Sequence, residues 1–434
     1  MPRQLHPLAA ALNADLAVPG SPILSMLSLK GQRAYFPSRG ILGQSAEAKD
    51  AAINATIGTA FEEDGSPLCL ECLEETVKLP STAFLYAPSF GIPGLRDMWK
   101  KMLCTKNPSL AGKSFSLPVV THALTHGLGV AGHLFVDAGD AVLLPDLFWD
   151  NYELLFEEAC GGRLTTFPMF VGSRFNVAGL EALLAAPGDK KIVVLNFPNN
   201  PTGYTATDED AAAICSALVN AAEAGKTLAV ILDDAYFGLV YEPSVRAESL
   251  FSTLADAHPN ILAVKLDGPT KEDYVWGFRT GFITFGCKGA TPAQYKALES
   301  KAAGLVRGSI SSASSIAQHL LLKAYASPAY AEQKAAKYEI LRRRYERIKE
   351  LLASHPEYSA SFEPMPFNSG YFMCVKPRGV DPEAVRKRLL SAHGTGVIVL
   401  SGLIRLAFSA VPLDKLETLF NNLHSAVQEV RQSP

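Results

Sequence analysis

The 434-residue sequence has no apolar run long enough to cross a membrane. A membrane helix needs about 20 mostly apolar residues, whereas Val142 to Trp149, for example, is interrupted by Pro145 and Asp146. The sequence also lacks a surplus of positive charge, because 40 Lys and Arg residues stand against 43 Asp and Glu residues, for a formal net charge of −3. We therefore expect neither a membrane nor a nucleic acid as a partner, since nucleic-acid binding depends on neutralising phosphates.

Cysteine is scarce, with seven residues spread along the chain. An odd number at scattered positions is typical of a reducing compartment, so we expect a cytoplasmic protein. Cys69 and Cys72 have the spacing of half a zinc site, but no second pair and no nearby histidine cluster completes four ligands. The sequence therefore predicts no metal site.

Apolar residues are plentiful, at 48% of the chain against 19% charged residues, which excludes disorder as the main state. Between residues 76 and 330 short apolar runs alternate with helical stretches, a pattern typical of a parallel sheet covered by helices. The expected strands are Leu117 to Thr121, Ala141 to Pro145, Ile192 to Phe197, Leu228 to Asp233, Ile261 to Leu266 and Phe282 to Phe285.

A long charged helix over residues 332 to 349 leads out of this region, with Ile340, Tyr345 and Ile348 at helical spacing. Two strand-like runs follow, at residues 370 to 375 and 404 to 408. We therefore predict a large α/β domain over residues 76–330. A smaller α+β domain is expected from an N-terminal segment, residues 1–75, and a C-terminal part, residues 331–434.

In an open parallel sheet, ligands bind at the carboxyl ends of the strands. Lys271 follows one expected strand, with Arg279 eight residues later, and Asp233 ends another. A buried amine can form a Schiff base with an aldehyde cofactor, a guanidinium can bind a phosphate, and a buried carboxylate can pair with a protonated ring nitrogen. Taken alone, however, Lys271 fits a solvated loop lysine better, and the alternative interpretation of Asp233 is a helix cap.

Together these residues form a more specific pattern. The combination of Asn200-Pro201-Thr202-Gly203, Asp233-x-Ala235-Tyr236, Lys271 and Arg279, in this order and at these intervals, resembles the pyridoxal-phosphate (PLP) aminotransferases of fold type I. The resemblance covers nearly the whole chain and is closest to the aspartate and aromatic amino acid aminotransferase branch. It implies a large domain with a mostly parallel seven-stranded sheet covered by helices, plus the smaller α+β domain.

The resemblance assigns roles around the cofactor ring. Lys271 would bind PLP and then act as the base that moves the α-proton of the substrate. Asp233 would keep the ring nitrogen protonated, Tyr236 and Asn200 would hydrogen-bond the ring oxygen, and Trp149 would stack on the ring. Lys271, Asp233 and Tyr236 are thus the expected catalytic residues.

The phosphate site is expected at Ala123, Leu124 and Thr125, where a helix begins after the strand that ends at Thr121. Free backbone N–H groups and the positive end of the helix dipole favour an anion there. By the resemblance, Arg279 completes the site, and Tyr86 reaches the phosphate of a neighbouring subunit, which implies a homodimer with shared active sites.

The phosphate site also departs from the family pattern. The family usually has small hydroxyl residues or glycine at the positions of Ala123 and Leu124, and a serine where this chain has Gly268. Two hydroxyl contacts are therefore expected to be missing. Thr121 and Thr270 are the candidates to replace them.

Substrate contacts are implied at Gly58, Trp149 and Asn200, and at two arginines. Arg405 matches the family's arginine that binds the substrate α-carboxylate through two parallel hydrogen bonds. Arg307 lies 28 residues after Arg279, about where the branch keeps an arginine for a side-chain carboxylate.

The expected activity is the transfer of an amino group from an L-amino acid, aspartate-like or aromatic, to a 2-oxo acid such as 2-oxoglutarate, by a ping-pong mechanism. The alternative is a PLP-dependent lyase or decarboxylase on the same scaffold, because the cofactor residues are shared. A regulator's sensor domain is disfavoured, since the first 45 residues are too short and too rich in Pro and Gly for a DNA-binding domain.

Overall fold

The computed structural model describes residues 5–17, 27, 32–33, 41–74 and 79–432. The predicted N-terminal segment is therefore described only in part. Within these residues no helix combines the length and the apolar composition needed to cross a membrane.

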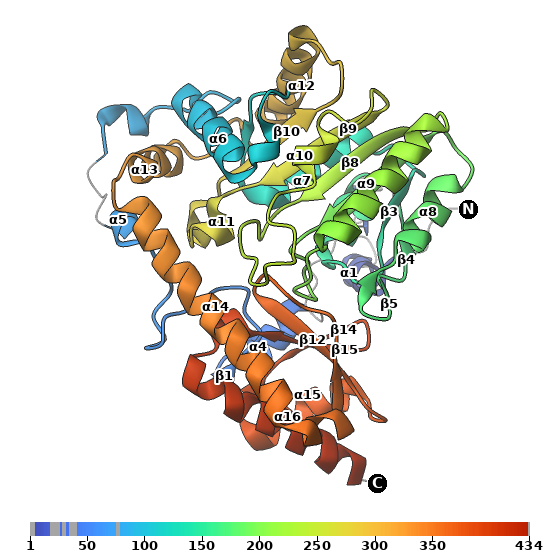
Figure 1. The fold of residues 1–434 in the computed structure, drawn as a ribbon, viewed down its shortest axis with the longest axis vertical. Coiled ribbons are helices and arrows are strands. Elements are labelled where there is room, and N and C mark those ends of the chain that lie inside the picture. The colour runs from blue at the N-terminus through green and yellow to red at the C-terminus, as the bar shows by residue number, and fades with distance from the viewer. Residues whose placement is uncertain (1–4, 18–26, 28–31, 34–40, 75–78, 433–434) are drawn as a thin grey trace.

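A seven-stranded sheet forms the centre of the larger part of the molecule (Figure 1), with the strand order β2-β10-β9-β8-β7-β3-β4. All neighbours pair in parallel except β10, which is antiparallel to both β2 and β9. This confirms the predicted mostly parallel α/β fold. The strands are β2 (Val119–Thr121), β3 (Ala141–Pro145), β4 (Arg163–Phe167), β7 (Lys190–Asn196), β8 (Thr227–Asp233), β9 (Ile261–Asp267) and β10 (Gly281–Gly286).

Helices cover both faces of this sheet because successive side chains of each strand point to opposite faces. Val193 and Val230, for example, face one apolar cluster, while Val194 and Ile231 face the other. The first cluster includes α6 (Pro93–Lys106), α8 (Val177–Ala185), α9 (Asp208–Glu223) and α10 (Phe251–Leu254). The second includes α7 (Ala123–Phe135), a π-helix (Glu153–Ala159) and α12 (Pro292–Ile310).

The strand predictions differ from the structure mainly at the edge of the sheet. β3 has the expected bounds, and the other expected strands begin or end within two residues of the observed ones. β4 was not predicted, because it is an edge strand whose polar residues are partly exposed and which therefore has no continuous apolar run.

The smaller domain is built around an antiparallel sheet of order β11-β12-β15-β14, and residues 41–54 of the N-terminal segment pack against it. Strand β1 (Ile53–Asn54) pairs in parallel with β13 (Thr395–Gly396). The sheet strands are β11 (Phe362–Pro364), β12 (Phe372–Pro377), β14 (Ile398–Leu400) and β15 (Leu403–Ala407). Its helices are α4 (Ile41–Glu47), α15 (Pro382–His393) and α16 (Leu416–Gln432).

The predicted charged helix is α14 (Tyr330–Ser354), which runs from the region of α13 (Ser315–Tyr325) to the smaller domain (Figure 1). Its buried residues include Tyr345 and Ile348, as the helical spacing predicted. The exact domain boundaries, after residues 75 and 330, remain predictions.

Candidate active site

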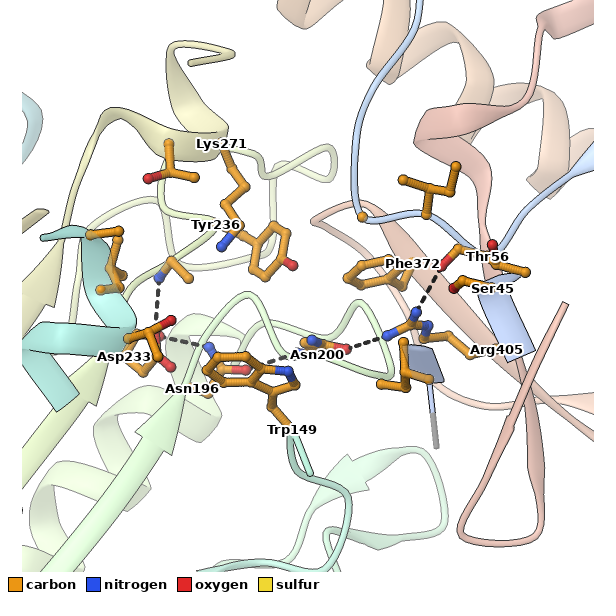
Figure 2. Close-up of a pocket in the computed structure, with 18 of the residues that line it drawn as sticks. Ser45, Thr56, Trp149, Asn196, Asn200, Asp233, Tyr236, Lys271, Phe372 and Arg405 are labelled. Atoms are coloured by element: carbon orange, nitrogen blue, oxygen red, sulfur yellow. Dashed lines mark hydrogen bonds between the residues drawn. The ribbon is translucent and has the colours of Figure 1, made fainter. Parts of the chain in front are cut away.

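A cavity of about 360 Å³ lies where β7, β8 and β9 end and α7 begins, and the smaller domain closes its other side (Figure 2). This volume is in the range of small-molecule sites. The predicted site residues that line it are Gly58, Ala123, Leu124, Thr125, Trp149, Asn200, Asp233, Tyr236, Lys271, Arg279 and Arg405.

Lys271 extends into this cavity from the short helix α11 (Pro269–Glu272), which directly follows β9 (Figure 2). Its Nζ lies 4.9 Å from the centre of the Tyr236 ring. Burial lowers the pKa of Lys271 to about 8, with Asp233 opposing and Arg279 reinforcing this shift. An amine of this pKa is partly neutral at physiological pH, as a nucleophile or a base must be.

Asp233 is the last residue of β8 and is buried. The hydroxyl of Tyr152 donates a hydrogen bond of 2.6 Å to Asp233 Oδ2, and the backbone N–H of Ala235 donates one of 3.2 Å to Oδ1. Burial raises the pKa of Asp233, while the Tyr152 bond and the charge of Lys271 oppose the rise. The carboxylate is thus held in a fixed orientation at the floor of the cavity.

Arg405 lies in the middle of β15 and is buried. Its Nη1 donates to Asn200 Oδ1 and its Nη2 to the carbonyl of Thr56, both at 3.0 Å, and its guanidinium lies 4.3 Å from the Phe372 ring (Figure 2). Among the described residues, Arg405 Nε has no hydrogen-bond partner and Arg405 forms no ion pair. A buried cation in this state favours an anionic ligand, which fits the predicted α-carboxylate.

The start of α7 has the properties of an anion site. Its N-cap residue, His122, makes no side-chain capping hydrogen bond, and Ala123 has a positive φ of 59°. Of the two candidate hydroxyls, Thr121 Oγ1 donates to the carbonyl of Ala123, whereas buried Thr270 Oγ1 has no partner among the described residues, and Thr270 lines the cavity. Thr270 is therefore the hydroxyl available to a phosphate.

The structure explains why no serine stands at position 268. A Cβ atom on Gly268 would lie 2.8 Å from the carbonyl oxygen of Thr280 and 3.0 Å from the Cα of Gly281. Contacts under 3.0 Å with backbone atoms cannot be relieved by moving a side chain. The backbone passes too closely here for any residue except glycine.

Two predicted residues do not line the cavity of this chain. The side chain of Tyr86 is 94% exposed. Arg307 lies on an exposed face of α12, where its Nη1 donates to Ser311 Oγ at 2.7 Å. Tyr86 was predicted to act in a neighbouring subunit, and its role and that of Arg307 stay predictions.

The structure adds residues that were not predicted. Asn196 accepts from the backbone N–H of Asn200 and donates to the carbonyl of Asp233, which joins the ends of β7 and β8. Tyr152, which binds Asp233, lies three residues after Trp149 and carries no motif that would single it out. The other unpredicted lining residues come mainly from the N-terminal segment: Ile41, Ser45, Thr56, Ile57, Ala235 and Phe372.

A family model described as aminotransferase class I and II matches residues 60–423. The chain belongs to this family. Its members are PLP-dependent, and the match confirms the resemblance seen in the sequence.

Individual relatives are distant. The chain is 27% identical to an aspartate aminotransferase of Musicola paradisiaca over 36% of this chain and 37% of that protein. It is 26% identical to the arginine–pyruvate transaminase AruH of Pseudomonas aeruginosa over 61% of each chain. The crystal structure of an aminotransferase from Anaerococcus prevotii has a TM-score of 0.81 at 20% identity, covering 93% of this chain and 99% of that one. The alignments with these two curated relatives span about a third to three fifths of their length.

The cavity fits PLP. Lys271 supplies the amine, Asp233 the carboxylate for the ring nitrogen, and Trp149 an aromatic ring opposite Lys271 (Figure 2). The start of α7, Thr270 Oγ1 and Arg279 would hold the phosphate. Within the part of the chain that the structure describes, Thr270 Oγ1 has no partner, and the side chain of Arg279 makes a single long hydrogen bond, of 3.5 Å, to the carbonyl of Trp276.

The lowered pKa of Lys271 predicts how PLP uptake depends on pH. Only the neutral amine attacks an aldehyde, so the uptake rate of cofactor-free protein should rise about tenfold per pH unit below pH 8. Above pH 8 the uptake rate should level off. Stopped-flow absorbance would measure this rate. An ordinary lysine, with a pKa near 10.5, would instead give a rate that still climbs between pH 8 and 10.

Proposed function

We propose that the protein is an aminotransferase that moves the amino group of an L-amino acid to a 2-oxo acid such as 2-oxoglutarate, by a ping-pong mechanism. The observation that carries this proposal is the placement in one cavity of half-buried Lys271 and of buried Arg405, which has no ion-pair partner among the described residues. This pair supplies a base and a carboxylate clamp for the same small substrate.

Each residue has a defined task in this reaction. Arg405 binds the α-carboxylate of the donor, and Lys271 Nζ removes the proton from its Cα, for which a pKa of about 8 is suited. Bound PLP supplies an electron sink for the resulting negative charge. Asp233, oriented by Tyr152, pairs with the ring nitrogen and keeps it protonated.

The cavity lining favours an aromatic donor over an aspartate-like one. Ile41, Ile57 and Phe372 line it, and its described cations, Lys271, Arg279 and Arg405, all have other tasks. A side-chain carboxylate buried without a cation is costly. Aspartate would be preferred only if a second subunit contributed a cation such as Arg307.

We infer a homodimer as the active unit. Phe84, Leu85 and Tyr86 are consecutive and are 75%, 66% and 94% exposed, which leaves a large apolar surface open to solvent. Such a surface is typical of an interface. In a dimer, Tyr86 would be available to the phosphate of the neighbouring active site.

Donor and acceptor dependence tests the proposal. PLP-loaded protein should lose its visible absorbance band when phenylalanine is added, and should regain the band when 2-oxoglutarate follows. Aspartate and leucine, tested in the same way, rank the donors, and phenylalanine is expected to react fastest. A product that forms repeatedly without any 2-oxo acid would instead favour the lyase or decarboxylase alternative.

A further inference from the structure

Two acidic residues come immediately after Lys271 in the chain. The proposed mechanism gives them no task. Glu272 and Asp273 are adjacent in the chain and are only 3% and 0% exposed. Two neighbouring buried carboxylates repel each other, and each is costly to bury without a cation or hydrogen-bond donors. Their presence beside the lysine therefore requires specific partners.

Lys334 is the cation that these two acids share. Its Nζ lies 2.8 Å from Glu272 Oε2 and 2.8 Å from Asp273 Oδ1. Lys106 binds Glu272 Oε1 at 2.9 Å, and the hydroxyls of Tyr325 and Tyr330 donate to Asp273 at 2.9 and 2.7 Å. Burial raises the pKa of Glu272, but Lys106 and Lys334 outweigh this effect and lower it to about 2. Glu272 is thus ionised at neutral pH.

The partners connect the Lys271 turn to the helix that leads into the smaller domain. Lys334 and Tyr330 lie in the first two turns of α14, which lies against α11 at this end (Figure 1). Tyr371, which precedes β12 of the smaller domain, donates a hydrogen bond of 2.8 Å to the carbonyl oxygen of Lys271. The three consecutive residues from Lys271 to Asp273 are therefore all bound from residues after 329.

The same helix binds the segment next to Arg405. Arg344, fully buried and ten residues after Lys334, donates to the carbonyls of Ser409 and Phe61 at 2.6 and 2.7 Å. Ten residues span about 15 Å of helix. Ser409 lies only four residues after Arg405. One helix therefore contacts both the Lys271 turn and the strand end beside Arg405.

We propose that Lys334 is a positioning residue that aligns Lys271 with Arg405. It binds Glu272 and Asp273 from the start of α14, and a later part of the same helix binds the segment that follows Arg405. This proposal rests on the proposed function. The carboxylate bound by Arg405 sets the position of the donor's Cα, and Lys271 Nζ must reach that atom. The Lys334 contacts set the relative position of these two groups.

The variant Lys334→Met separates alignment from local damage when two reactions of the PLP-loaded protein are compared. The first is the single-turnover reaction with phenylalanine, whose carboxylate requires Arg405. The second is the reaction with hydroxylamine, a small nucleophile without a carboxylate. We expect the first rate constant at saturating donor to fall about tenfold to a hundredfold, because a 1 Å displacement has an effect of this size. The hydroxylamine rate should not change.

A matched control is Arg342→Met, which removes a positive charge from the same helix. In the described part of the chain, the ion pairs of Arg342 lie within α14, with Glu339 and Glu346, so both rates should match the wild type. Lys334→Arg keeps the charge and should recover part of the phenylalanine rate. If Lys334→Met does not fold, Lys334→Gln serves for the same comparison. Equal loss of both rates, or no loss of the phenylalanine rate, would overturn the proposal.

A second measurement uses cofactor-free protein. The N–H groups of Asn368 and Gly370 bond across the two domains to the carbonyls of Gly203 and Leu239, at 2.9 and 2.7 Å. Amide hydrogen exchange in residues 366–371 should be faster in Lys334→Met than in Arg342→Met and the wild type. Equal exchange in all three proteins would contradict the proposal. Failure of the proposed function is a separate outcome, in which the wild type itself does not react with amino acids.

Discussion

Lys271→Ala is expected to reduce kcat for amino transfer by about 10⁴-fold or more, the upper range for loss of a positioned acid–base group. The alanine can neither bond to the cofactor nor remove the donor's Cα proton. PLP should still bind non-covalently, because Thr270, Arg279 and the start of α7 remain. Steady-state assays and equilibrium dialysis of PLP would measure the two effects separately.

Lys288→Ala is a matched control for this variant. Lys288 is exposed and does not line the cavity, so its loss should leave kcat unchanged. A Lys271→Ala protein whose kcat stays within tenfold of the wild-type value would exclude Lys271 as the base.

Arg405→Ala is expected to reduce kcat/KM for phenylalanine by about 10² to 4 × 10³-fold. Removing one partner of a buried ion pair costs about 3–5 kcal/mol, and each 1.4 kcal/mol corresponds to a factor of ten. The loss should depend on the donor's carboxylate. The measurement is therefore kcat/KM for phenylalanine and for 2-phenylethylamine, which has the same ring and amine but no carboxylate.

2-Phenylethylamine should react slowly with the wild type, and its kcat/KM should fall little further in Arg405→Ala. Arg405→Lys provides the control, because it keeps the charge but cannot form the two parallel hydrogen bonds of a guanidinium. Its kcat/KM for phenylalanine should lie between the values of the wild type and Arg405→Ala. A similar loss for both compounds would mean that Arg405 supports the fold of the site and does not bind the carboxylate.

The central strands and the residues at their carboxyl ends could be predicted from the sequence. Buried parallel strands form continuous apolar runs, so their ends, and hence Asp233 and Lys271, are marked by where the runs stop. β4 could not be found in this way, because it lies at the edge of the sheet and its residues are partly polar and exposed.

The cavity wall contributed by the smaller domain was harder to predict. Ile41, Ser45 and Thr56 line the same cavity as Arg405 only through tertiary packing, which sequence spacing does not encode. Similarly, the hydrogen bond from Tyr152 to Asp233 joins two segments 81 residues apart. From the sequence, glycine in place of the family's serine at position 268 predicted a missing hydroxyl contact. The structure shows that the close backbone of Thr280 and Gly281 requires glycine there.

Transfer of a nitrogen label tests the central claim most directly. PLP-loaded protein would be incubated with ¹⁵N-phenylalanine and unlabelled 2-oxoglutarate, and the amino acid products analysed by mass spectrometry. The account predicts that ¹⁵N appears in glutamate, in an amount equal to the phenylpyruvate formed, and that Lys271→Ala abolishes this transfer. Recovery of the label as free ammonia, or loss of the donor without labelled glutamate, would contradict the assignment as an aminotransferase.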